Sequence, residues 1–295
     1  MRHHRLRVSL RRRLRATAAL VLALFLLSAL SGCSVGSTIK GWFSSPAKQT
    51  SVKLTPKVKP PLIHEAGKLY IGVNLGMAPF AAKTADGYEG FDVALGRSIA
   101  KHLGLEPVFV ATAPDTMAAA LSDNSLDIAL SAPTDVSGLV VAQVYYQDTQ
   151  ALFAQSSEAS AVAATPRLPK TALQENSAAQ ALLVASMPST EASATLQLYP
   201  ALSAAIKACE KKQTKAVAGD YAVLRYAQLN GAKIRFVRPL STLSEDRGVA
   251  IRADNLDLMR KLKPILGDLD KTGVLGSIMH SWIGDNQLTA LKQKD

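Results

Sequence analysis

The chain has 295 residues, a formal net charge of +11 and two cysteines, Cys33 and Cys209. If Cys33 is covalently modified, Cys209 has no second cysteine in the chain with which to form a disulfide. The fold is then expected to depend on its hydrophobic core. The histidines and cysteines do not show the paired spacing of zinc ligands, so the sequence predicts neither a metal site nor a cofactor.

The first 33 residues have the features of a secretory signal. Seven arginines and no acidic residue precede an apolar run over residues 16–30. This run is about fifteen residues long, whereas a membrane-spanning helix needs about twenty. It ends in Leu30-Ser31-Gly32-Cys33, which resembles the lipobox of bacterial lipoproteins and implies that Cys33 becomes the lipidated first residue. The alternative is an uncleaved anchor helix with an incidental cysteine, but the position of Cys33 favours the lipoprotein.

The positive charge lies mostly in this signal and in the segment that follows it. The chain has 34 basic and 23 acidic residues, and without the seven arginines the counts are 27 and 23, or +4. From Glu65 onward the counts are 22 and 23, so nucleic acid is not predicted as a partner. Residues 34–66 contain many Ser, Lys, Thr and Pro residues and are predicted to form a flexible tether.

Residues 68–130 predict a strand, a helix and a second strand. The β-branched run at 69–73 favours a buried strand, and Asp92 is expected to cap the helix that follows. The apolar stripe of this helix leads to Gly104, and a strand is expected at 108–110. This order predicts a parallel pair of strands joined by a crossover helix.

The rest of the chain alternates in the same way. Strands are expected at residues 150–154, 161–164, 183–185, 214–218, 233–237 and 248–251. Helices are expected at 171–182, from Ser189, at 220–229, at 254–266 with Asp254 as the cap, and at 272–282. Strands that alternate with helices indicate the α/β class.

Three motifs carry a family resemblance through their order and spacing: Pro79-Phe80, Gly90-Phe91-Asp92 and Leu126-Asp127. They resemble the bacterial extracellular solute-binding proteins of family 3, which serve ABC importers of polar amino acids, and the resemblance extends over residues 67–284. It implies an α/β, two-lobed periplasmic-binding-protein-like fold of type II with a discontinuous lobe 1. Lobe 1 would comprise residues 67–154 and 243–295, and lobe 2 residues 155–242, with crossings near 152–157 and 239–247.

The resemblance also implies a cleft between the lobes that binds a solute. Asp220 stands where the family has an aspartate that pairs with the α-ammonium of the solute, although an aspartate there can also serve as a helix N-cap. Ser189 and Thr190 resemble the family's turn that receives an anion at a helix start, again with capping as the alternative. Pro188 replaces the family's glycine in this turn.

The segment after the expected strand at 126–130 departs from the family pattern. The family has Thr-x-x-Arg there, and its arginine clamps the α-carboxylate of the solute. This chain keeps Thr134 but has Ser137 at the arginine position. Because serine lacks a charged fork, the departure implies an amine, a basic or modified amino acid, or a small peptide-like solute. Arg247, near the second crossing, is either a substitute for that arginine or an exposed residue beside the crossing.

The other predicted lining residues are Asn74, Phe80, Tyr88 and Ser131. The ring of Phe80 is expected to pack against the solute, whereas Phe91 is expected to lie in the core under the first helix.

The predicted protein is a lipid-anchored, extracytoplasmic monomer that delivers a small polar solute, an amino acid or a related amine, to an ABC permease in the membrane. It is not expected to be an enzyme. One alternative is a ligand-sensing or partner-binding lipoprotein on the same fold, without transport. Another is an enzyme similar to the cyclohexadienyl dehydratases, for which Asp220 and Glu191 are the plausible acid–base carboxylates.

Overall fold

The structure is a computed structural model and describes residues 54–134, 137–241 and 245–284. The predicted signal and the lipidation site Cys33 lie outside the described residues. Within those ranges, no helix is both long and apolar enough to cross a membrane. The same residues form two five-stranded sheets and one two-stranded sheet.

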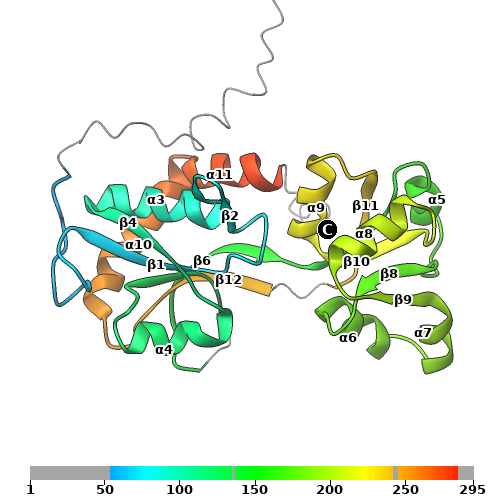
Figure 1. The fold of residues 1–295 in the computed structure, drawn as a ribbon, viewed down its shortest axis with the longest axis horizontal. Helices are drawn as coiled ribbons and strands as arrows, with labels where there is room; N and C mark the ends of the chain where they lie inside the picture. The colour runs from blue at the N-terminus through cyan, green and yellow to red at the C-terminus, as the bar shows by residue number, and fades with distance from the viewer. Residues whose placement is uncertain (1–53, 135–136, 242–244, 285–295) are drawn as a thin grey trace, which may run out of the picture. The chain divides into compact units, whose positions relative to one another are not determined.

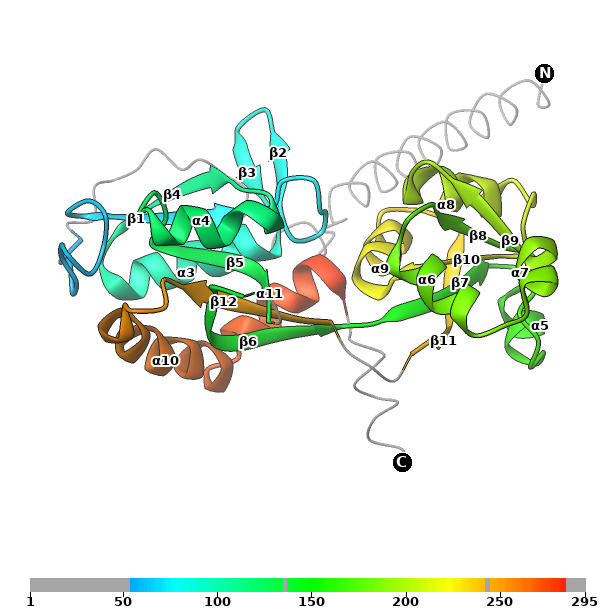
Figure 2. The ribbon, with the colours of Figure 1, turned by 90° about the horizontal axis from the view of Figure 1, so that it is seen from below.

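The first sheet has the strand order β4-β1-β5-β12-β6 (Figures 1 and 2). Its strands are β4 (Glu106–Ala111), β1 (Lys68–Val73), β5 (Ile128–Pro133), β12 (Glu245–Ile251) and β6 (Val140–Asp148). β1 is parallel to β4 and β5, which confirms the predicted parallel pair, and β12 is antiparallel to β5 and β6. Because β12 comes from late in the chain, lobe 1, which consists of this sheet and its helices, is discontinuous.

Helices cover both faces of this sheet. α3 (Phe91–Leu103) and α11 (Val274–Ile283) lie on one face and α4 (Met117–Ser122) on the other (Figure 1). α10 (Leu256–Lys271) contacts α3 and α11, while the hairpin β2 (Ala82–Thr84) and β3 (Gly87–Glu89) precedes α3. The predicted apolar stripe of α3 is buried, and Gly104 ends the helix at φ 70°, a left-handed conformation that glycine adopts readily.

The second sheet has the strand order β11-β7-β10-β8-β9 and forms lobe 2 with its helices. Its strands are β11 (Ile234–Pro239), β7 (Gln150–Gln155), β10 (Ala216–Asp220), β8 (Thr171–Gln174) and β9 (Leu196–Tyr199). The helices of this part are α5 (Ala159–Ala163), α6 (Ala178–Ala185), α7 (Ser189–Thr195), α8 (Leu202–Glu210) and α9 (Tyr221–Leu229).

The first crossing occurs earlier than predicted. β6 ends at Asp148 and β7 begins at Gln150 in the second sheet, so the chain changes sheet at Thr149 rather than within 152–157 (Figure 2). No Gly or Pro stands within residues 140–155, and of the residues next to the crossing Gln147 is exposed, whereas Asp148, Thr149 and Gln150 are buried. The sequence therefore has no turn signal at the crossing. The second crossing, between Pro239 and Glu245, falls inside the predicted range.

Three predicted elements of lobe 2 are wrong. Residues 161–164, expected as a strand, lie mostly in α5, and residues 183–185 belong to α6. The helix expected at 171–182 is wrong for its first part, because 171–174 form β8. β8 pairs in parallel with both β9 and β10, so pairing with distant strands overrides the local helix pattern.

Two predicted helix caps are also wrong. The N-cap of α3 is Gly90, and Asp92 lies in the first turn with its side chain fully buried. The N-cap of α10 is Asn255, whose side chain accepts a hydrogen bond from the backbone N–H of Leu258, so the expected cap Asp254 is one residue too early.

The C-terminal part of the predicted tether packs against lobe 1. Val58 and Ile63 are buried in the same core as α3. The backbone N–H of Lys57 donates to the carbonyl of Leu103 at 2.9 Å, and the Asn255 amide donates to the carbonyl of Leu62 at 2.9 Å. The prediction of a flexible tether is therefore wrong for this segment. Its apolar residues pack against the core of lobe 1, a contact that composition alone does not reveal.

Candidate functional site

A buried polar network joins α3, β5 and β6. The Tyr145 hydroxyl donates to Asp92 Oδ1 at 2.6 Å and accepts from the backbone N–H of Ser131 at 2.6 Å. Ser131, predicted to line the site, is 3% exposed and has φ 50°, an uncommon backbone conformation for serine. Burial raises the pKa of Asp92 to about 6, while the hydrogen bond from Tyr145 acts in the opposite direction.

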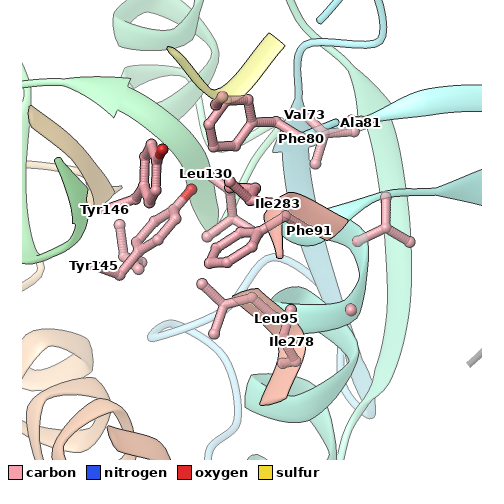
Figure 3. Packing of buried hydrophobic residues seen from close by; sticks show 14 of the residues in the cluster. Val73, Phe80, Ala81, Phe91, Leu95, Leu130, Tyr145, Tyr146, Ile278 and Ile283 are labelled. Carbon is pink, nitrogen blue, oxygen red and sulfur yellow. The ribbon is translucent and has the colours of Figure 1, made fainter. Parts of the chain in front are cut away.

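The rings of Phe80, Phe91, Tyr145 and Tyr146 pack together beside this network (Figure 3). The Phe91 ring stacks on Tyr145 with centroids 5.6 Å apart, and Phe80 packs edge-on against Tyr146 at 5.3 Å. Phe91 is fully buried, which confirms its predicted place in the core. Phe80 is also fully buried, so the ring predicted to contact the solute is covered in this structure.

A second group of polar residues lies where the chain passes from the first sheet to the second. This group, called the crossing cluster, consists of Tyr146, Asp148, Gln150, Asp220 and Arg247. The Gln150 amide donates to Asp220 Oδ1 at 2.5 Å. Asp148 Oδ2 is 3.6 Å from Nη2 of Arg247.

Asp148 carries out the capping role that was considered for Asp220. Asp220 occupies the N-cap position of α9, but its side chain makes no capping hydrogen bond. Instead, Asp148 Oδ1 accepts from the backbone N–H of Ala222 at 3.2 Å and from that of Thr149 at 2.9 Å. The Asp220 carboxylate therefore does not cap α9 and instead accepts from Gln150.

Burial and charge both act on the crossing cluster. Burial, and then the negative charge of Asp220, raise the pKa of Asp148 to about 7, while Arg247 lowers it. Burial also raises the pKa of Tyr146. Three atoms of the cluster are buried and have no hydrogen-bond partner among the described residues: Tyr146 Oη, Asp148 Oδ2 and Arg247 Nε. Buried polar atoms are normally paired, so this cluster is suited to donate hydrogen bonds to a bound molecule and to accept hydrogen bonds from it.

Arg247 is not the exposed residue that the sequence left open as an alternative. Its side chain is only 12% exposed, and its guanidinium carbon lies 4.6 Å from the centroid of the Phe80 ring. This distance is typical of a cation–π contact.

The other predicted site residues lie elsewhere. Thr134 and Ser137 are exposed around the turn after β5, and Ser189 and Thr190 are exposed at the start of α7. Asn74 is half-buried and accepts from the backbone N–H of Gly76 at 3.2 Å, and the Tyr88 ring packs edge-on against Phe109 at 6.4 Å. Of the predicted residues, Asp220 belongs to the crossing cluster and Ser131 to the Asp92 network.

Sequence reasoning missed Tyr146, Asp148 and Gln150. The available signal was Gln147-Asp148-Thr149-Gln150, four consecutive polar residues between two mostly apolar segments. Asp148, Thr149 and Gln150 are buried, and buried polar residues indicate a structural or binding role. In the described ranges, no group of three or more His, Cys, Asp or Glu side chains is arranged to hold a metal ion.

Comparison with known proteins places this fold and sequence in one family. The family model for bacterial extracellular solute-binding proteins, family 3, matches residues 69–285. No curated protein matches the chain.

Three solved structures illustrate the shared fold. A polar amino acid ABC uptake transporter substrate-binding protein from Streptococcus thermophilus is 19% identical with a TM-score of 0.63, covering 74% of this chain and 87% of that one. The L-cystine solute receptor of Neisseria gonorrhoeae, in an unliganded open conformation, is 19% identical with a TM-score of 0.59 (74% and 93% covered). An ancestral arginine-binding protein bound to arginine is 24% identical with a TM-score of 0.54 (75% and 100% covered). At these identities the likeness shows the fold alone, whereas the family match extends over most of the chain. The chain belongs to the bacterial extracellular solute-binding proteins, family 3.

Proposed function

We propose that this protein is the solute-binding component of an ABC importer and binds a small polar solute, an amino acid or a related amine, between its two lobes. The observation that carries the proposal is the crossing cluster. It brings the Asp148 and Asp220 carboxyl groups and the Arg247 guanidinium together and holds buried polar atoms without partners among the described residues. Family membership supports solute binding, and of the solved structures with this fold, one is an arginine-binding protein bound to arginine and another belongs to a polar amino acid uptake transporter.

Asp220 is the proposed partner of the amine group of the solute. Its side chain is half-buried, it does not cap α9, and Gln150 orients its carboxylate through a hydrogen bond to Oδ1. The negative charge of Asp220 already raises the pKa of Asp148, so a protonated amine beside both groups would relieve their repulsion. An ammonium group would therefore supply both the positive charge and the hydrogen-bond donors that suit the carboxyl groups of Asp148 and Asp220.

Replacing Asp220 with asparagine is expected to weaken binding of an amine-bearing solute by about 10- to 100-fold, because a charge-assisted hydrogen bond becomes a neutral one. Asparagine still accepts from Gln150, so the fold should be retained. The full-length chain in detergent would first be screened by thermal shift against L-amino acids and their decarboxylated amines. Dissociation constants of the hits would then be measured by calorimetry for wild type and variant.

Asp270→Asn is the matched control, since Asp270 is exposed on α10 and the same carboxylate is lost there. Equal affinities for wild type and Asp220→Asn would contradict the proposed role of Asp220. The absence of any hit among the amino acids and amines would contradict the proposed function itself. Because we propose binding without turnover, solutes recovered after incubation should be chemically unchanged.

We also propose that Cys33 anchors the protein to the membrane through lipid. When the chain is produced in a bacterial host with labelled palmitate, wild type is expected to incorporate the label and Cys33→Ser to lose it. Cys209→Ser is the control and should still be labelled, because Cys209 is a buried core residue of lobe 2. Labelling of the Cys33→Ser variant at the wild-type level would contradict the lipid anchor.

A further inference from the structure

Arg247 brings a positive charge to the end of β5. In the strand register it lies opposite Pro133, the last residue of β5, and opposite Tyr146 of β6. The turn that follows β5 carries Ser137, which is exposed and uncharged. Arg247 of the neighbouring strand β12 therefore supplies a positive charge at the end of β5. The turn residue Ser137 supplies no charge there.

The Arg247 guanidinium donates one hydrogen bond to a weak acceptor and forms one long ion pair. Its carbon lies over the Phe80 ring at 4.6 Å, and Nη1 is 3.5 Å from the thioether sulfur of Met77. Nη2 is 3.6 Å from Asp148 Oδ2, which is beyond ordinary hydrogen-bond length. Nε is buried and has no hydrogen-bond partner in the part of the chain that the structure describes.

This arrangement differs from that of an arginine with a purely structural role. A guanidinium carries a fork of N–H donors that fits a carboxylate through two parallel hydrogen bonds at about 2.8 Å. Asp148 does not provide such a pair, because its Oδ1 already accepts from the backbone N–H groups of Thr149 and Ala222. A largely buried guanidinium whose carboxylate partner lies beyond hydrogen-bond length is costly, and a bound carboxylate would offset part of that cost.

We propose that Arg247 binds the carboxylate of the solute through its guanidinium fork, while Asp220 binds the amine. The inference rests on the proposed function and narrows it, because the solute then carries both a carboxylate and an ammonium group rather than an amine alone. Arg247 is thus a specificity-determining residue, and Phe80 and Met77 hold its guanidinium in place from the apolar side.

The experiment compares the binding of amino acids, called acids below, with that of the corresponding amines, which lack only the carboxylate. The pairs are L-arginine with agmatine, L-cystine with cystamine, and L-glutamine with γ-aminobutyramide. Calorimetry on the full-length wild type should show at least one of the acids bound about tenfold or more tightly than its amine. Arg247→Met should weaken binding of that acid by about 10- to 100-fold and leave its amine nearly unaffected. Arg247→Lys, which keeps the charge but not the fork, should fall between the two.

Arg235→Met is the matched control, because Arg235 is exposed on β11. Equal affinity of the wild type for acid and amine would overturn the inference, and this measurement does not depend on any variant folding. The inference would also be overturned if the Arg247→Met variant still bound the amino acid more tightly than the corresponding amine. A protein that binds the amines but none of the three acids would overturn the inference and leave the proposed function standing.

Discussion

Replacing Gly90 with alanine is expected to lower the free energy of unfolding by about 4 kcal/mol or more, because the new methyl group has no room. Gly90 has φ 134°, and an added Cβ would lie 2.6 Å from the carbonyl carbon of Phe80 and 2.9 Å from the Cα of Ala81. The Phe80 carbonyl cannot move freely, because it accepts from the backbone N–H of Asp92 at 2.9 Å. Chemical unfolding of the full-length chain, followed by circular dichroism, would measure the loss.

Gly87 provides the control for backbone strain. It has a similar conformation, φ 126°, but an added Cβ there would meet nothing within 4 Å. Gly87→Ala should therefore show only the conformational cost of a positive φ, on the order of 1–3 kcal/mol. If both variants lose the same free energy, the close approach of Gly90 to Phe80 is not what requires glycine.

The free energy of unfolding is expected to fall as the pH rises from about 4 to about 7, on the order of a few kcal/mol in total. Burial raises the pKa of Asp92 from 3.8 to about 6, and burial followed by the charge of Asp220 raises that of Asp148 from 3.8 to about 7. Between the unfolded and folded pKa values the folded protein binds more protons than the unfolded chain. The stabilisation is therefore complete below about pH 4 and is lost as the pH passes through the folded pKa values.

Urea titrations at a series of pH values would measure this slope. Asp148→Asn should flatten its upper part, because the amide does not titrate and its oxygen can still accept from Thr149 and Ala222. The double variant Asp92→Asn/Asp148→Asn should leave a small slope from Asp127, whose pKa is also raised by burial. Asp270→Asn, on the exposed side of α10, should keep the wild-type slope. A double variant with an unchanged slope would show that other groups cause the pH dependence.

Local patterns were sufficient for the first half of lobe 1. The run at 69–73, the stripe of α3 and Gly104 each follow from the chemistry of neighbouring residues, so β1, α3 and β4 could be predicted. Residues 171–174 could not, because an apolar run of that length suits either a helix or a strand. Their strand conformation comes from pairing with β9 and β10, which lie further along the chain.

The candidate site shows the same division. Asp220 was predicted from its match to the family's ammonium-binding aspartate and from its place between a strand and a helix, but Asp148 and Arg247 could not be assigned a role from their neighbours in sequence. Asp148 accepts from Ala222, which is 74 residues away, and the Arg247 guanidinium contacts Met77, which is 170 residues away. Asp92 was mistaken for a cap for the same reason, since its partner Tyr145 is 53 residues away.

The sequence by itself therefore determined the family and most of the alternation of strands and helices, and it indicated Asp220 as a candidate, because these depend on motifs and on neighbouring residues. The tertiary structure alone decided where the chain changes sheet, which aspartate caps α9 and what surrounds Arg247. These features arise when distant segments are buried together, since burial then fixes which charges and hydrogen-bonding groups meet.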